Sequence, residues 1–142
     1  MTEFEAGPGH AEALRGFPLF ADLDEHTLEH VAETATEVEV PRGHVLIEPG
    51  QEGSGLLVVL DGTVAIQVGE DRLEKGAGEF LGELSLLVPG LTHTTRIQAA
   101  SPVRCLAIRR EDFEVLLKEH PQIAVAMLPM LARRQAETMA HL

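Results

Sequence analysis

Residues 56–68 read LLVVLDGTVAIQV, and this stretch decides the fold. Two runs of aliphatic and β-branched residues flank Asp61-Gly62, a pair that tolerates the positive φ angles of a tight turn, so the stretch predicts a β-hairpin. Similar short runs recur on both sides of it, with turn residues between them. The other predicted strands are residues 36–40, 44–47, 94–99 and 103–108. Short strands at this spacing predict an antiparallel sandwich or barrel.

Helices are predicted at both ends of this β region. Asp24 is a predicted N-cap for a helix that runs to about Thr34, because its carboxylate can accept free amide hydrogens of the first turn. Residues 110–119 have the helical spacing of apolar side chains, and Pro121 opens a second helix. Pro129 lies inside that helix and is expected to kink or break it. The predicted fold class is mainly β: an antiparallel β-roll of the jelly-roll type, with an N-terminal helix and two C-terminal helices.

Size and charge bound the possible functions. The chain has 142 residues and 15.4 kDa, which is enough for one domain, and its net charge of −12 disfavours nucleic acid and anionic lipid as partners. Residues 1–40 hold ten acids and one base, which makes either a solvated acidic surface or a docking face for a basic partner. We expect residues 1–10 to fray, residues 1–14 to form an acidic arm and residues 15–142 to form the domain.

Features that the sequence lacks limit the cellular location and the catalytic or metal-binding functions that can be expected. Its single cysteine, Cys105, is expected in the core and fits a reducing compartment, and the apolar runs are too short to cross a membrane, so we expect a cytoplasmic protein. No nucleophile elbow, P-loop or acid–base pair is found, so an enzyme is not expected. His26 and His30 have i, i+4 spacing on one helix, but no third ligand is evident, so neither a metal site nor a cofactor is predicted.

Residues 80–99, FLGELSLLVPGLTHTTRIQA, carry the functional signal. Gly82 allows close approach of the backbone to a ligand, and the amides of Leu84 and Ser85 would form an anion site at the start of a short helical turn. Glu83, beside that site, cannot bind a phosphate but can accept hydrogen bonds from a sugar hydroxyl. The strand from Thr94 returns toward the same pocket. The pattern predicts a site for a phosphorylated sugar.

The sequence resembles the cyclic nucleotide-binding domain family, which includes catabolite activator protein and protein kinase A regulatory subunits. The resemblance covers roughly residues 15–135 and follows the family's order and spacing. Its motifs are Leu19-Phe20, Pro41-x-Gly43-x-Val45, Glu48-Pro49-Gly50, Gly62-x-Val64 and Phe80-x-Gly82-Glu83-Leu84-x-Leu86. The family fold is an eight-stranded β-roll flanked by helices.

The resemblance implies a role for each residue of the segment. Gly82, Glu83, Leu84 and Ser85 correspond to the phosphate-binding cassette, in which the glutamate holds the ribose 2′-hydroxyl. His93 stands where the family has an arginine that pairs with the phosphate, and Thr94 follows at a position that contacts phosphate or base. Loss of that arginine would weaken binding about 10- to 100-fold, unless a protonated His93 compensates. Arg96 is predicted to lie on an outer face.

Two functions fit these residues. In the first, the chain is a regulatory module that senses a cyclic nucleotide (cAMP or cGMP) or a related phosphorylated small molecule and moves its C-terminal helices. In the second, a degenerate, ligand-free β-roll dimerises or docks a protein. In the family the last helix often forms a dimer interface, so a homodimer through the C-terminal helix is expected. DNA-binding relatives carry a helix-turn-helix after that helix, which residues 1–142 lack.

Overall fold

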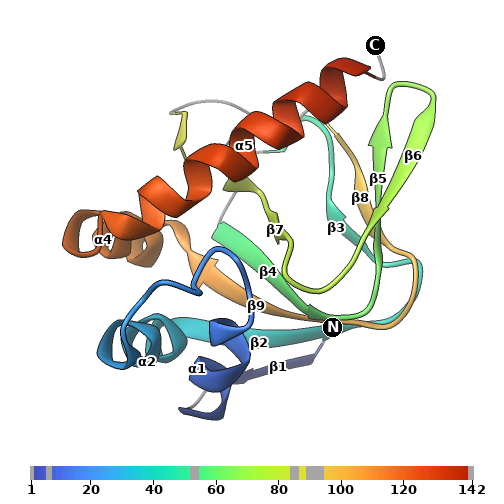
Figure 1. Ribbon diagram of the computed structural model, residues 1–142. Coiled ribbons are helices and arrows are strands. Elements are labelled where there is room, and N and C mark those ends of the chain that lie inside the picture. The colour runs from blue at the N-terminus through green and yellow to red at the C-terminus, as the bar shows by residue number, and fades with distance from the viewer. Residues whose placement is uncertain (1, 6–7, 52–54, 84–86, 89–94, 141–142) are drawn as a thin grey trace.

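Two antiparallel sheets and a set of flanking helices make up the computed structural model of the protein (Figure 1). The structure describes residues 2–5, 8–51, 55–83, 87–88 and 95–140. Within these residues the first sheet has the order β1-β2-β9-β4-β7 and the second the order β3-β8-β5-β6. The predicted fold class, an antiparallel β-roll with helices at both ends, is confirmed.

The elements have the following bounds. The first sheet consists of β1 (Thr2–Glu5), β2 (Ala35–Val40), β9 (Val103–Arg109), β4 (Gly55–Asp61) and β7 (Phe80–Leu81). The second consists of β3 (Val45–Ile47), β8 (Ile97–Ala99), β5 (Val64–Val68) and β6 (Asp71–Lys75). The helices are α1 (Pro8–Arg15), α2 (Glu25–Thr34), α4 (Arg110–Glu119) and α5 (Gln122–Ala140).

The strand β9 separates two hydrophobic cores because its side chains alternate between its faces. Val103 and Cys105 point into the core between the sheets, whereas Leu106 and Ile108 point into the core beneath the helices. Cys105 is fully buried, as predicted, and burial raises the pKa of its thiol to about 11. The first sheet is therefore covered on both faces, which fixes its register against slippage.

The helix α2 begins where the sequence predicts. The carboxylate of Asp24 accepts a hydrogen bond of 2.7 Å from the backbone amide of Thr27, which caps the first turn and lowers the pKa of Asp24. Leu28, Val31 and Ala32 are buried, as expected. The predicted helix at residues 110–119 is also confirmed.

The Asp61-Gly62 turn does not close a hairpin, so that prediction is wrong. β4 pairs with β9 and β7 in one sheet, whereas β5 pairs with β6 and β8 in the other. The turn carries the chain from one sheet to the other. Gly62 has φ +96°, and a Cβ there would lie 2.2 Å from the carbonyl oxygen of Pro102, so glycine is required by both backbone angle and space. The hairpin forms one turn later, where Val68 pairs with Asp71.

The N-terminal residues also differ from expectation, and of the two outcomes expected at Pro129, a kink or a break, α5 excludes the break. Residues 2–5 pair with β2 and residues 8–15 form α1, whose Leu14 is fully buried, so the expected fraying of residues 1–10 is wrong for these residues. The boundary between an arm and a domain at residue 15 stays a prediction. The helix α5 continues through the exposed Pro129 to Ala140, so it is not broken there. Among the described residues, no helix is both long and apolar enough to span a membrane.

Candidate functional site

A cavity of about 730 Å³ lies between α5, the β5–β6 hairpin and residues 77–83. This volume is within the range of small-molecule sites. Figure 1 shows α5 crossing the molecule beside β7 and the β5–β6 hairpin. The apolar part of the lining comes mainly from both sheets: Ile47, Ile66, Val68, Leu73, Phe80 and Ile97. The polar part comes from α5 and the chain around β7, so the cavity has an apolar floor and charged walls.

Gly82 and Glu83 lie on the wall of this cavity, directly after β7. Gly82 has φ +85°, a conformation that favours glycine, and this turn directs the chain away from the strand. The side chain of Glu83 is almost entirely buried, with 6% of its surface exposed. A buried carboxylate requires a partner, because burial without one would cost several kcal/mol, of the order of 3–5.

Arg134 of α5 is that partner. Its Nη1 donates a hydrogen bond of 2.6 Å to Oε1 of Glu83, and its Nη2 donates one of 2.7 Å to Oε2 of Glu79. The guanidinium carbon also lies 4.5 Å from the centroid of the Phe80 ring, a cation–π distance. One arginine of the last helix therefore binds two carboxylates and an aromatic ring around β7. The Glu83 carboxylate, expected to be available to a ligand hydroxyl, is occupied by a side chain of the protein.

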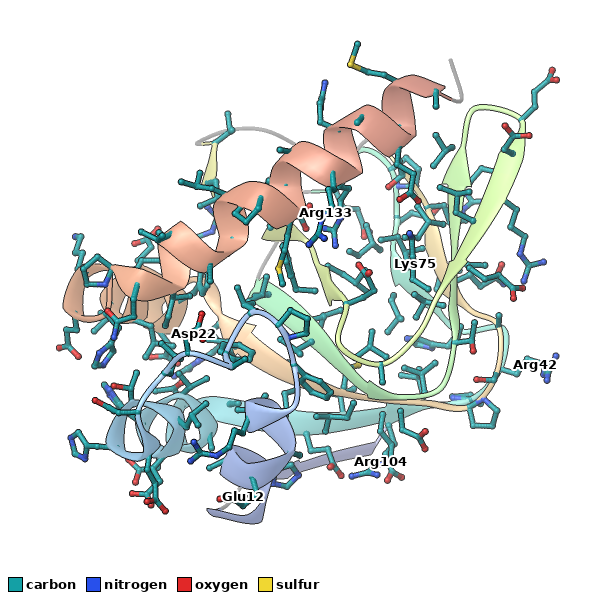
Figure 2. The ribbon with its side chains drawn as sticks, in the orientation of Figure 1. Glu12, Asp22, Arg42, Lys75, Arg104 and Arg133 are labelled. Carbon is teal, nitrogen blue, oxygen red and sulfur yellow. The ribbon has the colours of Figure 1, made fainter. Side chains whose placement is uncertain are left out.

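A second ion pair joins α5 to the hairpin. Nζ of Lys75, the last residue of β6, lies 2.7 Å from Oε1 of Glu137. Arg133 also lines the cavity, and in the part of the chain that the structure describes it has no carboxylate partner. Figure 2 shows Lys75 and Arg133 on two sides of the region between β6 and α5. Arg133 is thus available to an anion that enters the cavity.

The structure places two of the six predicted site residues. Gly82 and Glu83 line the cavity together with Thr95, whereas Leu84, Ser85, His93 and Thr94 lie outside the described residues. Arg96 is exposed, and its Nε donates a hydrogen bond of 2.9 Å to Glu48, so the prediction that it points away from the site is confirmed.

Arg134 and Glu79 are functional residues that the sequence did not predict. Glu79 directly precedes the quoted segment and lacked a partner that the sequence could identify. Arg133-Arg134 is a basic pair in a chain with 11 bases and 23 acids, and that pair was the available signal. Only the fold shows that Arg134 faces Glu83, because the two residues lie 51 positions apart in the sequence.

Comparison with known proteins gives a consistent family assignment. Residues 37–120 match the family model described as "Cyclic nucleotide-binding domain". A cyclic nucleotide-gated potassium channel from Rhizobium etli is 30% identical over 107 residues, which are 75% of this chain and 30% of the channel. The chain thus spans less than a third of the length of that relative.

Solved structures agree with this match. The N-terminal domain of a transcriptional regulator from Streptomyces coelicolor A3(2) is 34% identical, with a TM-score of 0.68 over 89% of this chain and 94% of that one. The catabolite activator protein of Thermus thermophilus is 27% identical, with a TM-score of 0.74 over 87% of this chain and 60% of that one. Both sequence and fold therefore point to the same family.

Proposed function

Because the chain belongs to the cyclic nucleotide-binding domain family, we propose that it is a regulatory module that senses a cyclic nucleotide or a related phosphorylated small molecule. The observation that carries the proposal is the cavity beside Gly82, with the buried carboxylate of Glu83 on its wall. Its relatives include proteins named for gating by cyclic nucleotides and for activation by cAMP. No catalytic role is proposed, and a cytoplasmic location stays a prediction.

The proposed ligand binds through two kinds of contact. A sugar hydroxyl donates to Glu83, and, as the family resemblance implies, the backbone amides of Leu84 and Ser85 bind the phosphate together with His93 and Thr94. Arg133, on α5, adds a positive charge at the cavity and is available to a phosphate. The apolar floor formed by both sheets then receives the base.

In this scheme the ligand hydroxyl takes the place of Arg134 at Oε1 of Glu83. A hydroxyl that donates to the Glu83 carboxylate replaces the guanidinium, and Arg134 then loses one of its two carboxylate partners. The ligand thereby favours an arrangement of α5 that differs from the present one. Such a shift requires differential affinity of the ligand for the two arrangements, and exchange at Glu83 supplies it.

The same helix offers a surface for dimerisation. Val125 and Leu128 on α5 are 65% and 64% exposed, and Met139 is 62% exposed. We propose that a second copy of the chain covers this face. Sedimentation of the protein against a Val125→Glu/Leu128→Glu variant tests it: the wild type should be a dimer and the variant a monomer, and a wild type that stays monomeric at high concentration would contradict the dimer.

The ligand proposal is tested by calorimetry and thermal shift with cAMP, cGMP and cyclic dinucleotides. A ligand at 100 times its Kd stabilises the native state by about 2.7 kcal/mol, which is a large shift for a domain of this size. Glu83→Gln should abolish the response. Glu74→Gln is the matched control, because Glu74 is an exposed glutamate on β6 that pairs only weakly with Arg72. A wild type that responds to no member of the panel would overturn the proposal.

A further inference from the structure

Three side chains of types that can bind a metal meet where α2 approaches the turn between α4 and α5. Nδ1 of His30 lies 3.2 Å from Nε2 of His120 and 3.8 Å from Oε2 of Glu119. One ligand atom from each of the three residues lies within 4.8 Å of the others. The sequence showed only the His26–His30 spacing, since Glu119 and His120 are about ninety residues away along the chain.

We propose that these three side chains bind a divalent transition metal, with Zn²⁺ as the best fit. Imidazole nitrogens lie about 2.0–2.1 Å from zinc, so two of them at a tetrahedral angle are about 3.3 Å apart. The observed separation of the two nitrogens is 3.2 Å, which leaves room for a metal after small rotations of the rings. Two imidazoles and one carboxylate are a ligand set that zinc accepts.

The residues around the three ligands favour a cation. His26, Glu29 and Glu33 line the same hollow of about 280 Å³ as His30, Glu119 and His120. His26 precedes His30 by one helical turn on α2 but is not one of the three residues whose ligand atoms lie within 4.8 Å of one another, so a water molecule completes four-coordination. Three carboxylates around two or three imidazoles make the hollow negative, which attracts a divalent cation.

The site is open to solvent. The side chains of His30 and Glu119 are 35% and 54% exposed, so a hydrated metal ion reaches them without unfolding of the protein. In the absence of metal, one imidazole nitrogen donates to the other, with the ring centroids 5.5 Å apart and the ring planes at 76°. Metal binding replaces this single hydrogen bond and links α2 to the end of α4, so it stabilises the native state.

The experiment uses Zn²⁺ itself, added to the full chain after treatment with a chelator. Calorimetry should give one Zn²⁺ per chain, and the melting temperature should rise with Zn²⁺ concentration. His30→Ala and His120→Ala should each weaken binding by more than about tenfold. His44→Ala is the matched control, because His44 lies between β2 and β3, outside the hollow, and should leave binding unchanged.

Two further measurements guard against a variant that fails to fold. Glu119→Gln removes the exposed carboxylate alone and should lower the affinity, while visible absorption of Co²⁺ added to the wild type reports tetrahedral nitrogen and oxygen ligands directly. The proposal is overturned if the His30→Ala/His120→Ala double variant binds Zn²⁺ as the wild type does. It is also overturned if Mg²⁺ raises the melting temperature as much as Zn²⁺, because the acidic surface would then be the cause.

Discussion

Arg134 and Glu83 are joined by a hydrogen bond of 2.6 Å between Nη1 and Oε1, although they lie 51 residues apart on α5 and at the end of β7. The carboxylate that the family resemblance assigns to a ligand hydroxyl is therefore already bound. An internal cation of this kind competes with any ligand that uses the same oxygen atoms. In the proposed function, exchange of this contact is what would connect the occupancy of the cavity to the position of the last helix.

Replacement of Arg134 by alanine should change affinity and stability in opposite directions. The affinity for a cyclic nucleotide should rise about fivefold, the equivalent of about 1 kcal/mol, because the competitor is gone and the guanidinium of Arg134, 28% exposed, is partly screened by solvent. The melting temperature without ligand should fall, because Glu83 loses its partner. Calorimetry and thermal unfolding measure the two effects. Arg72→Ala, which removes an exposed ion pair on β6, is the control and should change neither. A fall in affinity would show instead that Arg134 binds the ligand.

His93 should make ligand binding depend on pH. If it stands in for the family's phosphate-binding arginine, only the protonated imidazole supplies the charge, and an unperturbed histidine has a pKa of about 6.5. Cyclic nucleotide should then bind more tightly at pH 5.5 than at pH 8, and His93→Arg should bind more tightly at both values with little pH dependence. Titrations at the two pH values measure this. Equal affinities of the wild type at both would contradict the role of His93.

Glu37 should make the stability of the fold sensitive to acid. It is buried in β2, where its Oε1 accepts hydrogen bonds of 2.8 Å from Arg104 and from His10. Arg104 first, and His10 second, hold the pKa of Glu37 below its usual value of 4.5. Because the folded pKa lies below the unfolded one, the contribution is complete above about pH 4.5 and is lost as pH falls through the folded pKa.

The measurement is urea unfolding between pH 7 and pH 3. Glu37→Gln should lower the free energy of unfolding by about 1 kcal/mol at pH 7, and the difference from the wild type should shrink at pH 3. Glu39→Gln is the matched control, since Glu39 is 45% exposed and lies 3.7 Å from Nε of the same arginine. It should cost much less, and an equal cost for both variants would contradict the account.

The thiol of Cys105 should report opening of the core. It is fully buried on β9, and burial raises its pKa to about 11, so the native state exposes almost no thiolate at pH 8. A disulfide reagent should label the native protein at the rate of its opening, and the urea-unfolded protein within the mixing time. Rapid labelling of the native protein at a rate proportional to reagent concentration would contradict this burial.

Local signals in the sequence predict the elements that local contacts form. Asp24 marked the start of α2, and the alternation of Val38 and Val40 marked β2. Glu37 breaks that alternation, because it is buried by ion pairs with residues of α1 and β9 that the β2 sequence does not reveal. Likewise, Asp61-Gly62 predicted a turn correctly, but not which sheet the next strand would join, because that choice is made by long-range pairing.

In the candidate site, too, the sequence predicts the features that local residues determine but not those that depend on long-range contacts. The sequence predicted Gly82 and Glu83 from the chemistry of their own segment, and both line the cavity. Arg134 could not be placed, since its position depends on the path of α5. Pro129 predicted a kink or a break in that helix, and α5 is not broken, with Ile123 and Met127 buried before the proline and Arg134 bound after it. Tertiary contacts on both sides of Pro129 offset the loss of one backbone hydrogen bond.

Because ion pairs attach the end of α5, the salt concentration should affect how firmly this helix is held. Up to Leu131 the helix is held by apolar burial, which mobile ions scarcely affect, whereas Arg134 and Glu137 hold the last turns through charge pairs. Charges with partial exposure are screened over about 8 Å at physiological ionic strength and over shorter distances in concentrated brine. The C-terminal end of α5 should therefore detach more often in concentrated salt, while its first turns stay packed against the core. The cavity beneath the helix should then become more accessible to a ligand.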